Sequence, residues 1–271
     1  MPRLNRSRLL LAGFVAGALT VAAGVAVAQE LSTDNIRETS VSEGTPIEGL
    51  RPTGVGLPEL GGITSTTGLG DYPAVAKTYH DSGQYDRDLS AVDAKAERYL
   101  VKRAQKLRQK AKKKCKKKPC KKPKLGIVFD IDETSLSNYE ELQAVNFAGA
   151  GGALVAAVIS GDSPPIGPTQ EVFETALAKN VAVFFITGRP ESPEIRTLTE
   201  NNLASAGYQG YEELILNDTG EHTIEYKSGK RAEIEDRGYD IVTNIGDQES
   251  DLAGGHADRA FKLPNPYYFI P

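Results

Sequence analysis

Three short apolar runs that end in polar residues constrain the fold of this 271-residue chain most strongly. They are LGIVFDIDET (125–134), VAVFFITGRP (181–190) and DIVTNIGDQESD (240–251). Runs of this length, rich in β-branched and aromatic residues, are typical of parallel strands buried on both faces. Each run is therefore expected to deliver polar side chains at the carboxyl end of a strand.

Helix-like segments separate these runs along the chain. TQEVFETALAKN (169–180) precedes the second run, and YKSGKR (226–231) places Lys227 and Arg231 just before a helix-like AEIEDRGY ahead of the third. This alternation predicts an α/β fold with a doubly wound parallel sheet. Ligands bind beyond the carboxyl ends of the strands in such sheets, so the polar residues of all three runs are expected at one edge.

The first run ends in two acids, Asp130 and Asp132, which are two positions apart. On an extended backbone both carboxylates point to the same face. Like charges held together are destabilising unless a cation or a shared proton relieves them. A divalent metal or acid–base chemistry explains the pair, and a solvated Asp-rich turn is the alternative.

Four signatures in order resemble the acid phosphatases of the haloacid dehalogenase (HAD) superfamily. The first is DxDxT at 130–134 and the last is GDxxxD at 246–251, with Thr187 after a hydrophobic strand and Lys227 between them. DIDET, TGRP, YKSGKR and FKLPNPYYFIP resemble the secreted subgroup that includes plant vegetative storage proteins and is similar to bacterial class B acid phosphatases. The resemblance extends from Tyr72 to Pro271 and implies a HAD-like, Rossmann-like core over 125–271.

The resemblance also implies catalytic roles. Asp130 would attack phosphorus to form an aspartyl-phosphate. Asp132 would protonate the leaving oxygen and then deprotonate water, with a pKa raised by its acidic neighbours. Thr187 and Lys227 are expected to hold the phosphoryl oxygens. The adjacent Gly188 and Arg189 are expected to contribute to substrate binding, and Arg189 to add a second positive contact.

A magnesium site is the second implication. Mg²⁺ prefers oxygen ligands, and the expected ligands are Asp130, the backbone carbonyl of Asp132, Asp247 and Asp251. An insertion at about 135–167 would form a short cap and leave the site open to small phosphomonoesters. Two alternatives stay open: a non-catalytic storage or polyanion-binding protein on the same fold, and a phosphotransferase that uses the same intermediate.

The N-terminal residues suggest export. Residues 1–28 combine a basic start, an apolar run and a small-residue cleavage site, which is typical of a secretory signal peptide, with an uncleaved membrane anchor as the alternative. Residues 29–71 are rich in Gly, Ser, Thr and Pro and are expected to form a flexible linker. The protein is therefore predicted to be secreted or attached to the cell surface.

Residues 72–124 are predicted to form an N-terminal helical extension followed by a Lys-rich tract. The helix is expected to begin near a capping box at Ser90 and Asp93. Its apolar stripe consists of Val92, Ala96, Leu100, Ala104 and Leu107.

The Lys-rich tract, 102–124, contains 14 Lys or Arg residues and no acid, although the net charge of the whole chain is only −4. It is either a solvated, mobile stretch or a region that attracts an anionic cell-wall or membrane-surface polymer. It has no aromatic residue to stack on bases, so sequence-specific nucleic-acid binding is not expected. Cys115 and Cys120 lie inside the tract and are expected to form a small disulfide loop, as in exported proteins.

Overall fold

The computed structural model describes residues 72–116, 120–147, 150–220 and 223–268. The predicted signal peptide (1–28) and linker (29–71) lie outside these ranges. None of the helices within them is both long and apolar enough to cross a membrane.

The strands that the structure describes form one five-stranded parallel sheet in the order β3-β2-β1-β4-β5. The predicted doubly wound α/β fold is confirmed. Their bounds are β1 Lys124–Phe129, β2 Ala182–Pro190, β3 Glu213–Asn217, β4 Tyr239–Gly246 and β5 Ala260–Lys262. The three predicted runs are the three central strands, and the short outer strands β3 and β5 were not predicted.

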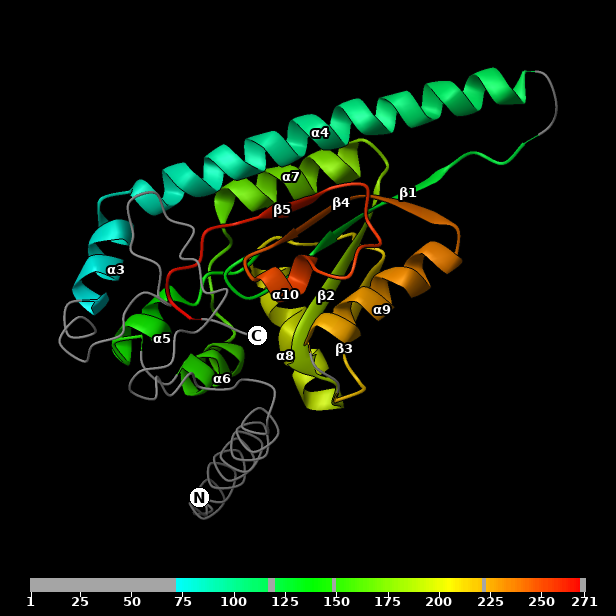
Figure 1. Ribbon diagram of the computed structural model, residues 1–271. Helices are drawn as coiled ribbons and strands as arrows, with labels where there is room; N and C mark the ends of the chain where they lie inside the picture. Colours follow the sequence, from blue (N-terminus) through cyan, green and yellow to red (C-terminus); the bar gives the residue numbers. More distant parts are fainter. Residues whose placement is uncertain (1–71, 117–119, 148–149, 221–222, 269–271) are drawn as a thin grey trace, which may run out of the picture.

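Helices cover both faces of this sheet (Figure 1). The long helix α4 and α7 lie along one face, and α9 lies on the other. The helices are α3 Tyr72–Asp81, α4 Gln84–Cys115, α5 Tyr139–Ala144, α6 Ala150–Ser160, α7 Gly167–Ala178, α8 Pro193–Ser205, α9 Thr223–Asp236 and α10 Glu249–Leu252.

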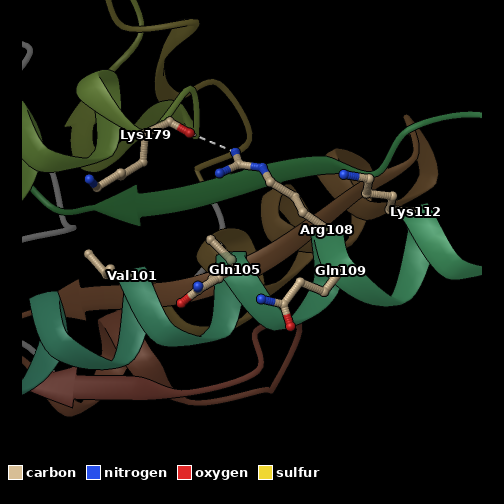
Figure 2. Close-up of a pocket in the computed structure, with 7 residues that line it drawn as sticks. Val101, Gln105, Arg108, Gln109, Lys112 and Lys179 are labelled. Atoms are coloured by element: carbon tan, nitrogen blue, oxygen red, sulfur yellow. Dashed lines mark hydrogen bonds between the residues drawn. The ribbon is translucent and has the colours of Figure 1, made fainter.

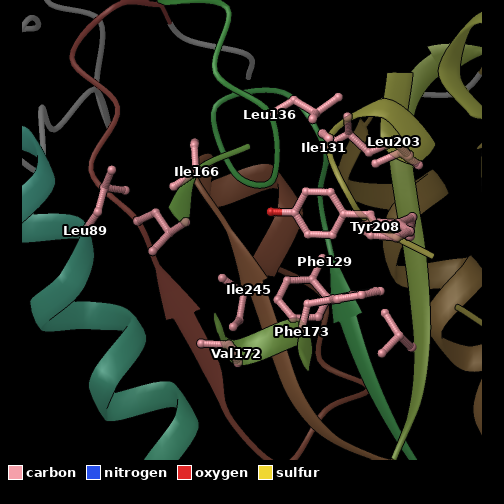
Figure 3. Close-up of a cluster of buried hydrophobic side chains, with 14 of the residues drawn as sticks. Leu89, Phe129, Ile131, Leu136, Ile166, Val172, Phe173, Leu203, Tyr208 and Ile245 are labelled. Atoms are coloured by element: carbon pink, nitrogen blue, oxygen red, sulfur yellow. The ribbon is translucent and has the colours of Figure 1, made fainter. Parts of the chain in front are cut away.

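Alternate residues of the central strands divide the core between the two faces. In β1, Ile127 and Phe129 join the cluster under α4 and α7, whereas Val128 joins the smaller cluster under α9. Phe129 lies near Phe173 of α7, with ring centroids 6.5 Å apart (Figure 3). Burial on both faces explains why this strand has no polar side chain from Leu125 up to the acids.

Helix α4 confirms the predicted apolar stripe but not the predicted start. Ala96, Leu100 and Ala104 are buried, yet the helix begins at Gln84, after a left-handed Gly83 with φ of 70°. Asp93 therefore lies inside the helix rather than at its first turn. It is buried and accepts a hydrogen bond from Thr169 of α7 at 3.0 Å, so its polar group serves helix packing instead of capping.

The first half of the Lys-rich tract continues the same helix. Helix α4 extends to Cys115, so residues 102–115 form regular structure rather than a mobile stretch. Cys115 and Cys120 form the expected disulfide, with Cα atoms 5.2 Å apart, and this bond closes the reversal between α4 and β1.

The insertion predicted as a cap contains α5 and α6. The small residues of this segment form α6, a helix whose Leu154 and Val158 are buried. The Ala-rich sequence favours a helix, and the apolar side gives it a surface to pack.

Candidate active site

Three carboxylates meet beyond the carboxyl ends of β1 and β4. Asp130 follows β1 directly, Asp247 follows β4, and Asp251 lies in the short helix α10. Each offers an oxygen within 4.8 Å of the others, and all three residues are buried. Carboxylate oxygens in such a cluster are the ligands that hard divalent cations prefer, so these residues could hold a metal ion.

Lys227 of α9 contacts two of these carboxylates. Its Nζ lies 2.5 Å from Asp130 Oδ1 and 2.6 Å from Asp251 Oδ1. Lys227 and Arg231 were expected just before a helix, but both lie within α9. This position lets α9 bring the ammonium group to the edge of the sheet from the face opposite α4.

The cluster carries more negative charge than Lys227 can balance. Burial, and then the charge of Asp251, raise the pKa of Asp130 well above its usual value, and the same two causes raise the pKa of Asp247 to about 6. Burial alone would lower the pKa of Lys227, but Asp130 and Asp251 outweigh it and raise that pKa. A bound cation would relieve the remaining repulsion, so the donor set fits a divalent metal such as Mg²⁺.

Asp247 and Asp251 are fixed by their surroundings. Thr134 donates to Asp247 Oδ1 at 2.8 Å, and Gln248 and Asn265 donate to Oδ2 at 2.6 and 2.7 Å. A Cβ atom at Gly246 would lie 2.4 Å from the Asp251 Cβ. The backbone at the end of β4 can therefore approach Asp251 only because residue 246 is glycine.

Asp132 pairs with Arg189, which was expected to contact substrate. The guanidinium donates from Nη2 to Asp132 Oδ1 at 2.7 Å and from Nε to Oδ2 at 3.0 Å, and its Nη1 donates to Thr199. Burial acts to raise the pKa of Asp132, but this two-bond pairing with Arg189 outweighs it and lowers the pKa. The prediction that acidic neighbours raise this pKa is therefore wrong.

A second set of contacts orients Asp132, and the sequence reasoning did not find it. Asn138 Nδ2 donates to Asp132 Oδ1 at 2.9 Å and is itself held by Ser163 of the cap segment. Glu133 accepts from the Asn138 backbone N–H at 2.5 Å and from the Tyr85 hydroxyl of α4 at 3.1 Å. Glu133 occupies the variable position of DxDxT, so the signature gave no reason to single it out.

The remaining predicted residues also lie at this edge. Thr187 is buried near the end of β2, and its hydroxyl accepts from the Arg189 backbone N–H at 3.2 Å. Gly188 is partly exposed, and a Cβ atom there would meet nothing within 4 Å. The backbone carbonyl of Asp132, an expected metal ligand, accepts from the Tyr268 hydroxyl at 3.3 Å.

A comparison of the sequence with known protein families agrees with this arrangement of the site residues. The model of HAD superfamily, subfamily IIIB (acid phosphatase), covers residues 71–271. The chain belongs to this HAD family. The resemblance found in the signatures is thereby confirmed, over nearly the same residues.

Relatives of this HAD chain include differently named plant proteins. Acid phosphatase 1 of Solanum lycopersicum is 36% identical over 157 residues, which cover 53% of this chain and 58% of that protein. Vegetative storage protein 1 of Arabidopsis thaliana is 34% identical over 150 residues, with coverages of 53% and 55%. The chain thus spans little more than half the length of these relatives.

A solved structure shares the HAD fold. The class C acid phosphatase from Bacillus anthracis, determined with tungstate bound, aligns with a TM-score of 0.51 at 20% identity. The alignment covers 74% of this chain and 86% of that one. At this identity the match supports the fold of the chain and nothing finer.

Proposed function

We propose that this protein is a secreted, Mg²⁺-dependent acid phosphatase that hydrolyses small phosphomonoesters through an aspartyl-phosphate. The observation that carries the proposal is the buried cluster of Asp130, Asp247 and Asp251 with Lys227, next to the oriented Asp132. Membership of the acid phosphatase subfamily supports it.

In the proposed first step, an Asp130 carboxylate oxygen attacks phosphorus and the bond to the leaving oxygen breaks. Asp132 gives that oxygen a proton, which its lowered pKa lets it carry only at acidic pH, and the product alcohol leaves. In the second step Asp132 takes a proton from water, which attacks the aspartyl-phosphate and releases inorganic phosphate. Thr187 and Lys227 would bind the phosphoryl oxygens, and Gly188 would line the same site.

Arg189 takes a different part from the one expected from the sequence. Because its guanidinium holds both oxygens of Asp132, it would keep that carboxyl aimed at the leaving oxygen and the water. Asn138, which donates to Oδ1 of the same carboxyl, would do the same. A carboxyl held by two partners loses less entropy in each proton transfer.

The metal would be held by Asp130, Asp247 and Asp251, with the Asp132 backbone carbonyl as a further oxygen ligand. When bound, Mg²⁺ supplies positive charge that stabilises the phosphoryl oxygens in the transition state. All of these metal ligands are oxygen atoms, and oxygen ligands favour Mg²⁺ over softer metals.

Secretion is supported by the disulfide between Cys115 and Cys120. Disulfides persist in oxidising compartments and are rare in the cytosol. The predicted signal peptide, 1–28, would direct the chain to such a compartment. We also propose that the Lys-rich tract keeps the secreted protein near an anionic polymer, through counterion release.

The decisive experiment measures phosphate release from an aryl phosphate with and without a chelator, for the wild type and for Asp130→Asn. We expect the chelator to abolish release and Mg²⁺ to restore it. We expect Asp130→Asn to lower kcat by at least about 10⁴-fold, because the amide is no nucleophile. Asp240→Asn is the matched control, since Asp240 is exposed near the start of β4.

Three results would contradict the proposal: activity that the chelator leaves intact, full activity of Asp130→Asn, or no activity in the purified wild type on any small phosphomonoester. The last would favour a storage protein, the class named among the relatives. Adding an alcohol acceptor distinguishes the phosphotransferase alternative. A transferase would release much less inorganic phosphate than product alcohol.

A further inference from the structure

The end of the molecule away from the active site carries two adjoining hollows beside α4, and Figure 2 shows the residues that line the smaller one. One, of about 430 Å³, lies between α4 and Lys179 after α7. The other, of about 730 Å³, lies between the end of α4, Asn180 and the segment before β1. Both are lined by Arg108 and Lys112, so they form one groove.

Cationic side chains line both hollows of this groove. We call it the basic groove and define it by its cationic lining residues, which are Arg108, Lys112, Lys116, Lys122 and Lys179. Among the residues that the structure describes, no acid lines either hollow. In the part of the chain that the structure describes, none of its four lysines forms an ion pair with a carboxylate.

Arg108 fixes the walls of the groove. Its Nη2 donates to the backbone carbonyls of Lys179 at 2.6 Å and Asn180 at 3.1 Å, and Figure 2 shows the first of these bonds. Its guanidinium thus serves as the hydrogen-bond donor to the backbone carbonyls that follow the end of α7. The disulfide of Cys115 holds the far wall. The lysine side chains, which are exposed, are left to meet a ligand.

The spacing of the cations favours a linear ligand. Arg108 and Lys112 lie four residues apart on α4, and Lys116, four residues further, caps the end of the helix, so successive Cα atoms are about 6 Å apart along one face. A single phosphate is too small to meet charges spread over about 12 Å. No aromatic residue of the described ranges lines the groove, so these ranges offer no surface there on which nucleic-acid bases could stack.

We infer that the basic groove binds a linear phosphate polymer that carries no bases. This inference deepens the polymer attraction proposed for the Lys-rich tract and is independent of the phosphatase activity. The groove lies at the amino end of β1 and Asp130 follows its carboxyl end, so the two sites are about 20 Å apart. A polymer in the groove would leave the active site open.

The test compares two triple variants that each remove three charges. The groove variant removes three charges from the groove through Lys112→Gln, Lys116→Gln and Lys179→Gln. Lys106→Gln, Lys110→Gln and Lys114→Gln form the control, because these exposed lysines lie on the opposite side of α4 with the same four-residue spacing. The probe is long-chain inorganic polyphosphate, titrated in chelator without Mg²⁺ so that it is not hydrolysed.

We expect the groove variant to bind polyphosphate at least tenfold more weakly at about 0.1 M salt, and the control less than threefold more weakly. The slope of log K against log salt should fall in magnitude by about two in the groove variant, as for three lost phosphate contacts. Equal losses in the two variants would overturn the inference and leave only a diffuse attraction to the tract.

Two further probes test the kind of ligand. An oligothymidylate of matched charge that binds as tightly as polyphosphate, or anionic phosphatidylserine vesicles that bind when polyphosphate does not, would also overturn it. Both triple variants should hydrolyse an aryl phosphate at the wild-type rate. The binding assay and the activity assay therefore test the two proposals separately. A groove variant that loses polyphosphate binding but keeps full activity supports this inference alone, and polyphosphate binding by a wild type without activity contradicts only the proposed enzyme function.

Discussion

Charged side chains differ in burial and in pairing between the two ends of the sheet. At the carboxyl end, charged side chains are buried and each has a specific partner, as in the contacts of Lys227 and Arg189. At the amino end, the lysines of the basic groove are exposed and share one sign. Removing a buried partner leaves an uncompensated charge, whereas removing an exposed one returns a side chain to water. Substitutions at the two ends should therefore differ greatly in cost.

The largest effect is expected from Lys227→Met. Without the ammonium group, the carboxylates of Asp130 and Asp251 face each other in a buried site. We expect the free energy of unfolding at neutral pH to fall by about 3–5 kcal/mol, with part of the loss recovered in Mg²⁺. Denaturant unfolding with and without Mg²⁺ measures this. The matched control is Lys230→Met on the same helix, which removes a pair with Asp218, a carboxylate whose side chain is about half exposed. A loss no larger than the control would show that the two ends do not differ.

Arg189→Lys should have the next largest effect. Lysine cannot make both bonds to Asp132, so we expect kcat to fall about 10–100-fold with little change in KM. Arg196→Lys, whose partner Glu191 is on the surface, is the control and should keep its activity. A rise in KM at constant kcat would instead mean that Arg189 binds the phosphate of the substrate, as the sequence alone suggested.

Asp93 offers a smaller test, away from both ends. Burial raises its pKa to about 7, and Glu171 adds to the rise, although the bond from Thr169 opposes it. An acid with a raised pKa in the folded state contributes stability at low pH that is lost as the pH rises through about 7. The free energy of unfolding of Asp93→Asn relative to wild type should therefore rise by about 2 kcal/mol from pH 5 to pH 8. Denaturant titrations at both pH values measure it, and a constant difference would contradict it.

The smallest effect is expected from Arg103→Gln. Arg103 pairs with Asp258 at 2.7 Å on the surface, with about 30% of each side chain exposed. Such pairs contribute about 0–1 kcal/mol, so thermal unfolding should shift by only a few degrees at most. A loss comparable to that of Lys227→Met would break the contrast between buried and exposed charges.

The sequence predicted the central strands and the residues that follow them because both leave local signals. The apolar runs mark β1, β2 and β4, and the acids at 130, 247 and 251 follow their ends. The outer strands were missed since β3 and β5 are only five and three residues long, too short for a periodic pattern. Their position depends on pairing with β2 and β4, which no local pattern encodes.

The partners of the predicted residues were harder to foresee. Arg189 and Asp132 are 57 positions apart, and nothing in TGRP distinguishes a guanidinium that binds substrate from one that binds Asp132. Glu133 and Tyr85 meet across 48 positions. Gly83 marks the true start of α4, but the polar pair at Ser90 and Asp93 gave a stronger local signal. The position of Asp93 inside α4 is instead set by tertiary packing, in which its carboxyl accepts a hydrogen bond from Thr169.

The long helix α4 has a consequence for the order in which the chain folds. It precedes the whole sheet in the sequence, yet it packs on α7, β4 and β5, and β4 ends at Gly246, about 130 residues after the helix ends. At 5–20 residues per second, synthesis of that stretch takes roughly 7–26 seconds. During this time the apolar stripe of α4 has no sheet to cover it. An unfolded chain awaiting export would keep the stripe available to chaperones, and the positive charges that follow it would limit self-association until the last strands arrive.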